Sequence, residues 1–209
     1  MMHRIPTAKP HNFVPKRIYH YILSFDVDEL RQNAAGNFSL PFIIKKPDKN
    51  PPNVKDGGES EVIEYVENLL SIGILNNDEK IIVSPFDMTF QNQCWIVIQI
   101  ESKINNWQFS VDDYGLTTKV DSDRHCSLRH VENGKVQPAG ERVKDDGCRV
   151  LYFGIVARAG KGHVGASELF NFHTEFLTPG LDEQGKPITK RLKVIFDPDI
   201  KNEGSPIPP

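Results

Sequence analysis

The sequence has 209 residues, of which 38% are hydrophobic and 25% charged, and its formal net charge is -3. These values are ordinary for a folded domain, and the slight negative charge argues against a nucleic-acid binder, which normally carries a basic surface. No stretch approaches the ~18 apolar residues of a membrane helix, and the first residues lack the apolar centre of a secretory signal. We therefore expect one cytoplasmic domain that binds neither nucleic acid nor membrane.

The content of cysteine, proline and aromatic residues further restricts the fold class that we expect. Cys94, Cys126 and Cys148 form no Cys-x-x-Cys pair, and an odd number of cysteines argues against a disulfide framework. Cys94 falls on the apolar face of an alternating segment, so we interpret it as a buried thiol. Fifteen prolines, fifteen glycines and twelve phenylalanines favour short strands joined by many turns.

The first third of the chain predicts two short strands and one helix. Residues 1–16 show no periodicity and predict a flexible arm, whereas 18–25 alternate and predict a strand. Residues 38–44 predict an edge strand because they contain a proline. Residues 45–60, rich in proline and without an apolar pattern, predict a mobile loop. A helix is predicted over 61–75, where five apolar side chains recur at helical spacing. They are Val62, Ile63, Val66, Leu69 and Leu70.

From residue 80 onward the pattern is typical of strands. Residues 94–101 alternate, with Cys94, Ile96, Ile98 and Ile100 on one face and Trp95 and Val97 on the other. Residues 107–120 predict a strand and an Asp-Asp-Tyr-Gly turn. The Glu-Asn-Gly-Lys sequence at 132–135 predicts a hairpin turn, and the apolar run at 149–157 predicts a buried strand.

The chain closes with two more alternating segments. In 168–177, Phe170, Phe172, Thr174 and Phe176 share one face, and Asn171, His173 and Glu175 share the other. We interpret the polar face, including His173, as solvent-exposed. In 191–197, Leu192, Val194 and Phe196 repeat the apolar face, and we expect all three to be buried. The strand should stop at Pro198, and residues 197–202 predict a turn.

Together the segments predict a mainly β protein. The expected fold is an immunoglobulin-like antiparallel β-sandwich with one amphipathic helix and a flexible N-terminal arm. The sandwich domain is expected to span 17–204, with the mobile loop at 45–60, the helix at 61–75 and a disordered tail at 205–209.

One literal glycine motif follows the apolar run at 149–157. Gly160, Gly162 and Gly165 form a GxGxxG pattern, which in dinucleotide-binding folds lets a pyrophosphate approach a helix N-terminus. The segment after it alternates and lacks a helical period, so we interpret the motif as a hairpin turn. The three glycines stay cofactor-binding candidates only on the alternative that a nucleotide binds there.

The remaining polar clusters define no site from their spacing. Asp121, Asp123 and His125 alternate, with Asp112 and Asp113 upstream, but the glycine and bidentate glutamate of a calcium loop are missing at the required offsets. We interpret them as a solvated loop and predict no metal site. There is no GxSxG and no local cysteine signature, so no catalytic residue is assigned and no cofactor is expected.

Three segments resemble a known group of proteins. They are NWQFSVDDYGL (106–116), ELFNFHTEF (168–176) and KVIFDPDIKNEG (193–204). They are similar to small bacterial β-sandwich proteins whose closing strand runs into a DPxIxN motif, here Asp197, Pro198, Asp199, Ile200 and Asn202. Automatic annotation names some of these proteins nucleotide synthetases, and a related group is the DP-EP family. The resemblance implies a β-sandwich and carries over no catalytic residue.

These features favour a non-catalytic interaction or small-ligand-binding module, with a protein or small ligand as its partner. A nucleotide-acting enzyme using the 160–165 loop is the alternative, although the sequence contains no P-loop. A structural or assembly subunit is the second alternative, because sandwiches can form homo-oligomers through sheet edges.

Overall fold

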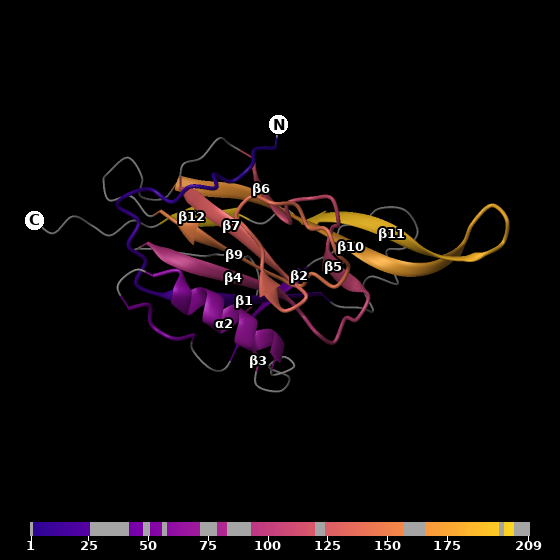
Figure 1. Cartoon of the computed structure of the whole chain (residues 1–209), viewed down its shortest axis with the longest axis horizontal. Coiled ribbons are helices and arrows are strands. Elements are labelled where there is room, and N and C mark those ends of the chain that lie inside the picture. Colours follow the sequence, from indigo (N-terminus) through magenta and orange to yellow (C-terminus); the bar gives the residue numbers. More distant parts are fainter. Residues whose placement is uncertain are drawn as a thin grey trace, which may run out of the picture.

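The computed structural model describes residues 2–25, 42–47, 51–55, 58–71, 79–82, 93–119, 124–156, 166–196 and 199–202. Figure 1 shows the arrangement of their secondary structure. The elements in chain order are β1 (Ile18–Phe25), β2 (Phe42–Pro47), α2 (Ser60–Ser71), β3 (Glu79–Ile82), β4 (Cys94–Ile100), β5 (Trp107–Phe109), β6 (Leu116–Thr118), β7 (His125–Glu132), β8 (Lys135–Val136), β9 (Val150–Ile155), β10 (Ala166–Leu181), β11 (Pro187–Phe196) and β12 (Asp199–Asn202).

The strands form two sheets, which confirms the predicted mainly β sandwich. The first sheet has seven strands in the order β3-β2-β1-β4-β9-β7-β8. The second is centred on β10, with β11 and β12 along one edge and β5 and β6 along the other. One pair departs from the expected antiparallel pattern, because β1 runs parallel to β4. Such a pair needs a crossover connection, and the long segment between the two strands, which includes α2, provides it.

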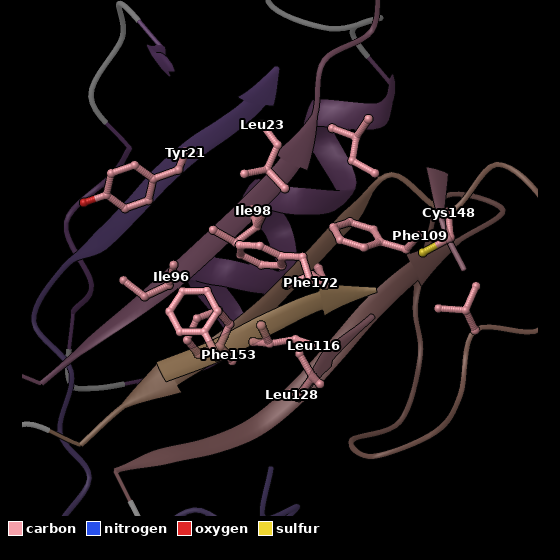
Figure 2. Packing of buried hydrophobic residues seen from close by; sticks show 14 of the residues in the cluster. Tyr21, Leu23, Ile96, Ile98, Phe109, Leu116, Leu128, Cys148, Phe153 and Phe172 are labelled. Carbon is pink, nitrogen blue, oxygen red and sulfur yellow. The ribbon is translucent and has the colours of Figure 1, made fainter. Parts of the chain in front are cut away.

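The main hydrophobic core lies between the two sheets. All seven residues of β4 are buried, and the face with Ile96 and Ile98 joins the core while Trp95 and Val97 face away from it. Figure 2 shows Ile98 beside Phe172 of the second sheet. The alternation predicted for this strand is confirmed, and each fully buried side chain of this size stabilises the fold by about 1.5–3 kcal/mol.

The helix α2 covers the other face of the first sheet. Val62 and Val66 are 0% exposed and pack in one cluster with Trp95 and Tyr152, and Figure 1 shows α2 lying along β1 and β4. The molecule therefore has three layers, one helical and two of strands. Within the described residues, no helix has the length and apolar character needed to cross a bilayer.

A carboxylate fixes the start of this helix. Glu59, which directly precedes α2, contacts Lys9 Nζ at 2.7 Å, Arg129 Nε at 2.7 Å and Tyr152 Oη at 2.9 Å. Burial alone would raise the pKa of Glu59. The hydrogen bonds from Lys9 and Tyr152 and the charge of Arg129 outweigh it, so the pKa lies below its ordinary value. One side chain thus ties the N-terminal residues, the helix and the sheet together.

The N-terminal residues, expected to form a flexible arm, run along the sandwich. His3 pairs with Thr118 of β6 through two backbone hydrogen bonds of 2.7 and 2.9 Å. Ile5 is 1% exposed and joins the main core. Phe13 meets Trp95 edge-on at 5.0 Å between ring centroids. Farther along, Val54 of the expected mobile loop packs against the helix-side cluster.

One predicted turn is present in the structure, and a second segment that was predicted to be a turn is a strand. Asn133 and Gly134, with φ of 50° and 74°, form the two-residue turn between β7 and β8, as the sequence predicts. The closing Asp199–Asn202 segment was expected to be a turn and is instead a strand, β12, paired with the start of β10. The closing motif therefore extends the second sheet.

The β10–β11 hairpin reaches beyond the sandwich. Figure 1 shows its far end projecting away from both sheets, and every residue from Glu183 to Lys193 is exposed. Leu192 was expected to be buried and is 39% exposed, because it lies where the hairpin has left the body. Val194, two residues on, packs against the core.

Candidate functional site

Most residues of the glycine motif and of the Asp121–His125 cluster are outside the described part of the chain. Gly160, Gly162 and Gly165 are outside the described residues, as are Asp121 and Asp123. His125 is 1% exposed and lies beside Phe153 and Phe170 in the core. The interpretation of His125 as part of a solvated loop is therefore wrong, because it is the first residue of β7 and faces inward.

Polar side chains instead gather on the outer face of the second sheet, the face of β10 that points away from the core. Strand pairing places β5, β6 and β11 beside β10, and their outward residues join those of β10 and two loop carboxylates. We call this set the polar layer. It consists of Gln108, Asp113, Thr117, Asp146, Asn171, His173, Glu175, Arg191 and Lys193.

The polar layer is not open to solvent along β10. Asn171, His173 and Glu175 are 5%, 6% and 0% exposed, so the expectation of a surface His173 is wrong. The 110–115 loop lies over this face, because Val111 N donates to Glu175 Oε1 at 3.3 Å and Asp113 Oδ1 lies 3.9 Å from His173 Nδ1. Asp146 and Arg191 add a second cover over Glu175. Alternation fixed the direction of these side chains, but their burial depends on loops that pack from elsewhere in the chain.

His173 lies between a hydroxyl and a carboxylate. Its Nε2 is 2.7 Å from Thr117 Oγ1, and its Nδ1 is 3.9 Å from Asp113 Oδ1. A neutral ring with its proton on Nδ1 points that proton toward the carboxylate and leaves Nε2 to accept from the hydroxyl. Burial lowers the pKa of His173, Asp113 opposes this effect and Lys193 adds to it, and the net shift is downward. The ring is therefore neutral at pH 7 and can act as a base.

Glu175 lies in a second part of the layer and is fully buried. Its Oε1 accepts from Arg191 Nη1 at 2.5 Å, Gln108 Nε2 at 2.9 Å and Val111 N at 3.3 Å. Its Oε2 has no partner among the described residues. A buried carboxylate oxygen without a donor is uncommon. This oxygen is therefore a position where a ligand could supply a hydrogen bond.

Asp146 shares its partners with Glu175. Gln108 Nε2 donates to Asp146 Oδ1 at 2.8 Å, and Arg191 Nη2 lies 2.8 Å from the same oxygen. The hydrogen bond from Gln108 and the charge of Arg191 hold the pKa of Asp146 below its ordinary range, against a smaller effect of burial. Across the layer, three carboxylates thus face two cations, since Lys193 Nζ lies 3.3 Å from Asp113 Oδ2. Among the described residues, no group of three or more acidic, histidine or cysteine side chains is arranged to hold a metal ion.

A cavity of about 300 Å³ lies elsewhere, beside β1. Its lining includes Arg17, Tyr19, His20 and Asn53, and none of its described lining residues belongs to the polar layer. His20 is 3% exposed and its Nδ1 lies 3.0 Å from Tyr65 Oη. This histidine is therefore packed and hydrogen-bonded.

A family model described as a predicted novel nucleotide synthetase matches residues 59–205, more than half of the chain. The chain belongs to this family. No curated protein and no solved structure matches it. The match confirms the resemblance seen in the sequence, and the segments at 106–116 and 168–176 that carry it are neighbours in the second sheet.

The matched span of this nucleotide synthetase family contains the whole polar layer, from Gln108 to Lys193. Sequence reasoning missed the layer because its members are far apart in the chain and alternate with core residues. The available signal was His173 and Glu175 in an aromatic-rich strand, together with Asp113 in the turn of the other resembling segment. Pairing of the two segments brings all three together.

Proposed function

We propose that the chain is a nucleotide-acting enzyme in which His173 is the base that removes a proton from an attacking hydroxyl. Two observations support this function. The chain belongs to a family described as a predicted novel nucleotide synthetase. The second, which carries the proposal, is the imidazole of His173 held between the Thr117 hydroxyl and the Asp113 carboxylate. The proposal takes the nucleotide alternative but moves its site from the 160–165 loop to the polar layer.

The arrangement suits the formation of a bond between oxygen and phosphorus. In such a step the hydroxyl oxygen of one substrate bonds to a phosphorus of a nucleoside triphosphate, and pyrophosphate leaves. The hydroxyl proton passes through Thr117 Oγ1 to His173 Nε2, because these atoms are already in hydrogen-bond contact at 2.7 Å. Asp113 stabilises the imidazolium that forms, and Lys193 and Arg191 supply positive charge for the phosphate oxygens of the substrate.

The test is turnover of nucleoside triphosphates with Mg²⁺, measured as pyrophosphate release and by chromatography of the products. We expect activity in the wild type and a loss of about a hundredfold or more in His173→Gln. Thr117→Val, which removes the hydroxyl and keeps the shape, should lose activity to a similar degree.

His130→Gln is the matched control. His130 is also buried, at 2% exposed, and lies 3.3 Å from the Glu132 carboxylate, but it belongs to the first sheet. Loss of activity in His173→Gln with a cooperative melt and normal activity in His130→Gln supports the proposal. Wild-type protein that turns over no nucleotide, or equal losses in both variants, would refute it.

The projecting β10–β11 hairpin favours a second candidate function, a non-catalytic interaction module. Four large apolar side chains are exposed on it. Leu181, Ile188, Leu192 and Ile195 are 59%, 40%, 39% and 52% exposed, and β11 is an edge strand of its sheet. An edge of this kind can pair with another strand.

Light scattering across a concentration series tests self-association through this edge. If the hairpin pairs copies of the chain, the wild type should form dimers and Ile195→Lys should remain monomeric. Monomers at every concentration would contradict self-association.

A further inference from the structure

Two guanidinium groups lie around one aromatic ring at the tip of the 110–115 loop. Arg4 Cζ is 4.8 Å from the centroid of the Tyr114 ring, and Arg142 Cζ is 5.3 Å from the same centroid. The two arginines come from distant parts of the chain, and both are exposed. Arg4 is held in place because its Nη2 donates to the Gly140 carbonyl. The cations are thus positioned by the fold and not merely scattered on the surface.

A hydrogen bond to Tyr114 and the charges of Asp113 and Asp112 raise the pKa of Arg142, so carboxylates lie near this cluster. In the described part of the chain, neither Arg4 nor Arg142 forms an ion pair, whereas Asp113 on the same loop is paired with Lys193. A hydrogen bond with Arg142, together with the charges of both arginines, lowers the pKa of Tyr114 below its ordinary value despite an opposing effect of burial. Two guanidinium groups held beside one ring concentrate positive charge that attracts an anion.

The cluster adjoins the polar layer. His3 pairs with Thr118 in antiparallel register, which places Arg4 opposite Thr117, the residue that contacts His173. Residues opposite one another in a sheet point to the same face. Tyr114 follows Asp113, the carboxylate on the other side of the same histidine. An anion bound between Arg4 and Arg142 would therefore lie beside the residues that flank His173.

We infer that Arg4, Arg142 and Tyr114 form a phosphate-binding subsite that takes the polyphosphate of a nucleotide. This inference rests on the proposed function and names its substrate class more closely. Guanidinium groups match phosphate because their donors form a planar fork and are weakly hydrated. The Tyr114 ring keeps the two cations near each other by cation–π contact. Arg4 lies before residues 59–205, so part of the subsite comes from outside the span that defines the family.

The experiment measures binding to the full chain by titration calorimetry at low and at moderate salt. The probes are ATP, inorganic triphosphate and adenosine, without turnover conditions. Arg4→Gln and Arg142→Gln each remove one cation from the subsite, and melting curves verify that each variant is folded. Lys186→Gln is the control, because it removes the same charge at the exposed turn of the hairpin.

We expect ATP and inorganic triphosphate to bind the wild type, and each arginine variant to raise their Kd about tenfold. The Kd should be unchanged in Lys186→Gln and should increase with salt. The arginine substitutions should have no effect on any binding of adenosine. Wild-type protein that binds neither triphosphate, or arginine variants that bind as tightly as the wild type, would overturn the inference.

Measurements of nucleotide turnover test the phosphate-binding subsite separately from the enzymatic function on which it rests. Arginine-dependent binding without any turnover would refute the enzymatic proposal and leave the phosphate subsite standing. Turnover that requires His173 but is unaffected by either arginine substitution would refute the subsite and leave the enzymatic proposal standing.

Discussion

The two partners of the Glu175–Arg191 ion pair are buried to different extents. We therefore predict that removing the arginine destabilises the protein more than neutralising the glutamate. The side chain of Glu175 is 0% exposed, whereas that of Arg191 is 38% exposed. Arg191 also has a second partner, Asp146, at 2.8 Å. The two substitutions to compare are Arg191→Gln and Glu175→Gln.

The structure sets the expected magnitudes. Loss of one partner from a buried pair costs about 3–5 kcal/mol. We expect about 3 kcal/mol for Arg191→Gln, the low end of that range, because Gln108 and Val111 still donate to the buried carboxylate. Glu175→Gln keeps an acceptor for both donors and leaves Arg191 with Asp146 and water, so about 1–2 kcal/mol is expected. The double substitution should cost at least about 1 kcal/mol less than the sum of the single ones.

Urea unfolding at pH 7, followed by tryptophan fluorescence, measures these differences. Trp107 is a suitable probe because it is 0% exposed and stacks on Phe176 of β10, with 5.8 Å between ring centroids. Lys190→Gln, an exposed charge removal on the same strand as Arg191, is the control and should be near neutral. If Glu175→Gln costs as much as Arg191→Gln, or if the two costs simply add, the reasoning from burial is wrong.

Three further outcomes are expected. Glu59→Gln should lower the free energy of unfolding by about 2 kcal/mol at pH 7. Because the pKa of Glu59 is lowered in the folded protein, the stability difference between wild type and variant should be complete above about pH 4.5 and vanish as the pH falls through the folded pKa. A difference unaffected by acid would contradict this. The rate of pyrophosphate release should rise with pH and level off before about pH 6.5, because burial and Lys193 lower the pKa of His173 more than Asp113 raises it. A rate that continues to rise above pH 7 would count against His173 as the base. Gly140→Ala should lower the free energy of unfolding by about 1–2 kcal/mol, since φ is 76° at this position. It should also weaken triphosphate binding, because the added Cβ would displace the guanidinium of Arg4. An unchanged melting temperature would contradict the first expectation and an unchanged Kd the second.

The sequence predicted those parts of the fold that local pattern determines. The two faces of β4, the helix with Val62 and Val66 on its buried side, and the Asn133-Gly134 turn all follow from periodicity or turn chemistry. The parallel pairing of β1 with β4 could not be predicted in this way, because the direction of a pair is set by the path of the connection between the strands. Leu192 was assigned to the core because alternation gives the face of a residue but not the point where a hairpin leaves the body.

The candidate site was harder to predict for a related reason. A polar residue alternating with phenylalanines, such as His173, has the same pattern whether its face meets water or another segment of the same chain. Here the 110–115 loop packs against that face, and the segment containing Arg4 runs beside it. These contacts join residues separated by more than fifty positions, so no short window of sequence contains them. The glycine motif at 160–165, by contrast, is conspicuous in one window and lies outside the described residues.

The projecting hairpin also provides a practical attachment point. Gln184 is exposed in the turn between β10 and β11, while all three native cysteines are buried and free. A cysteine introduced at Gln184 would therefore be the readily accessible thiol on the folded protein. A fluorophore or sensor-chip linker attached there would stand clear of the sandwich and leave the polar layer and the Tyr114 cluster unobstructed.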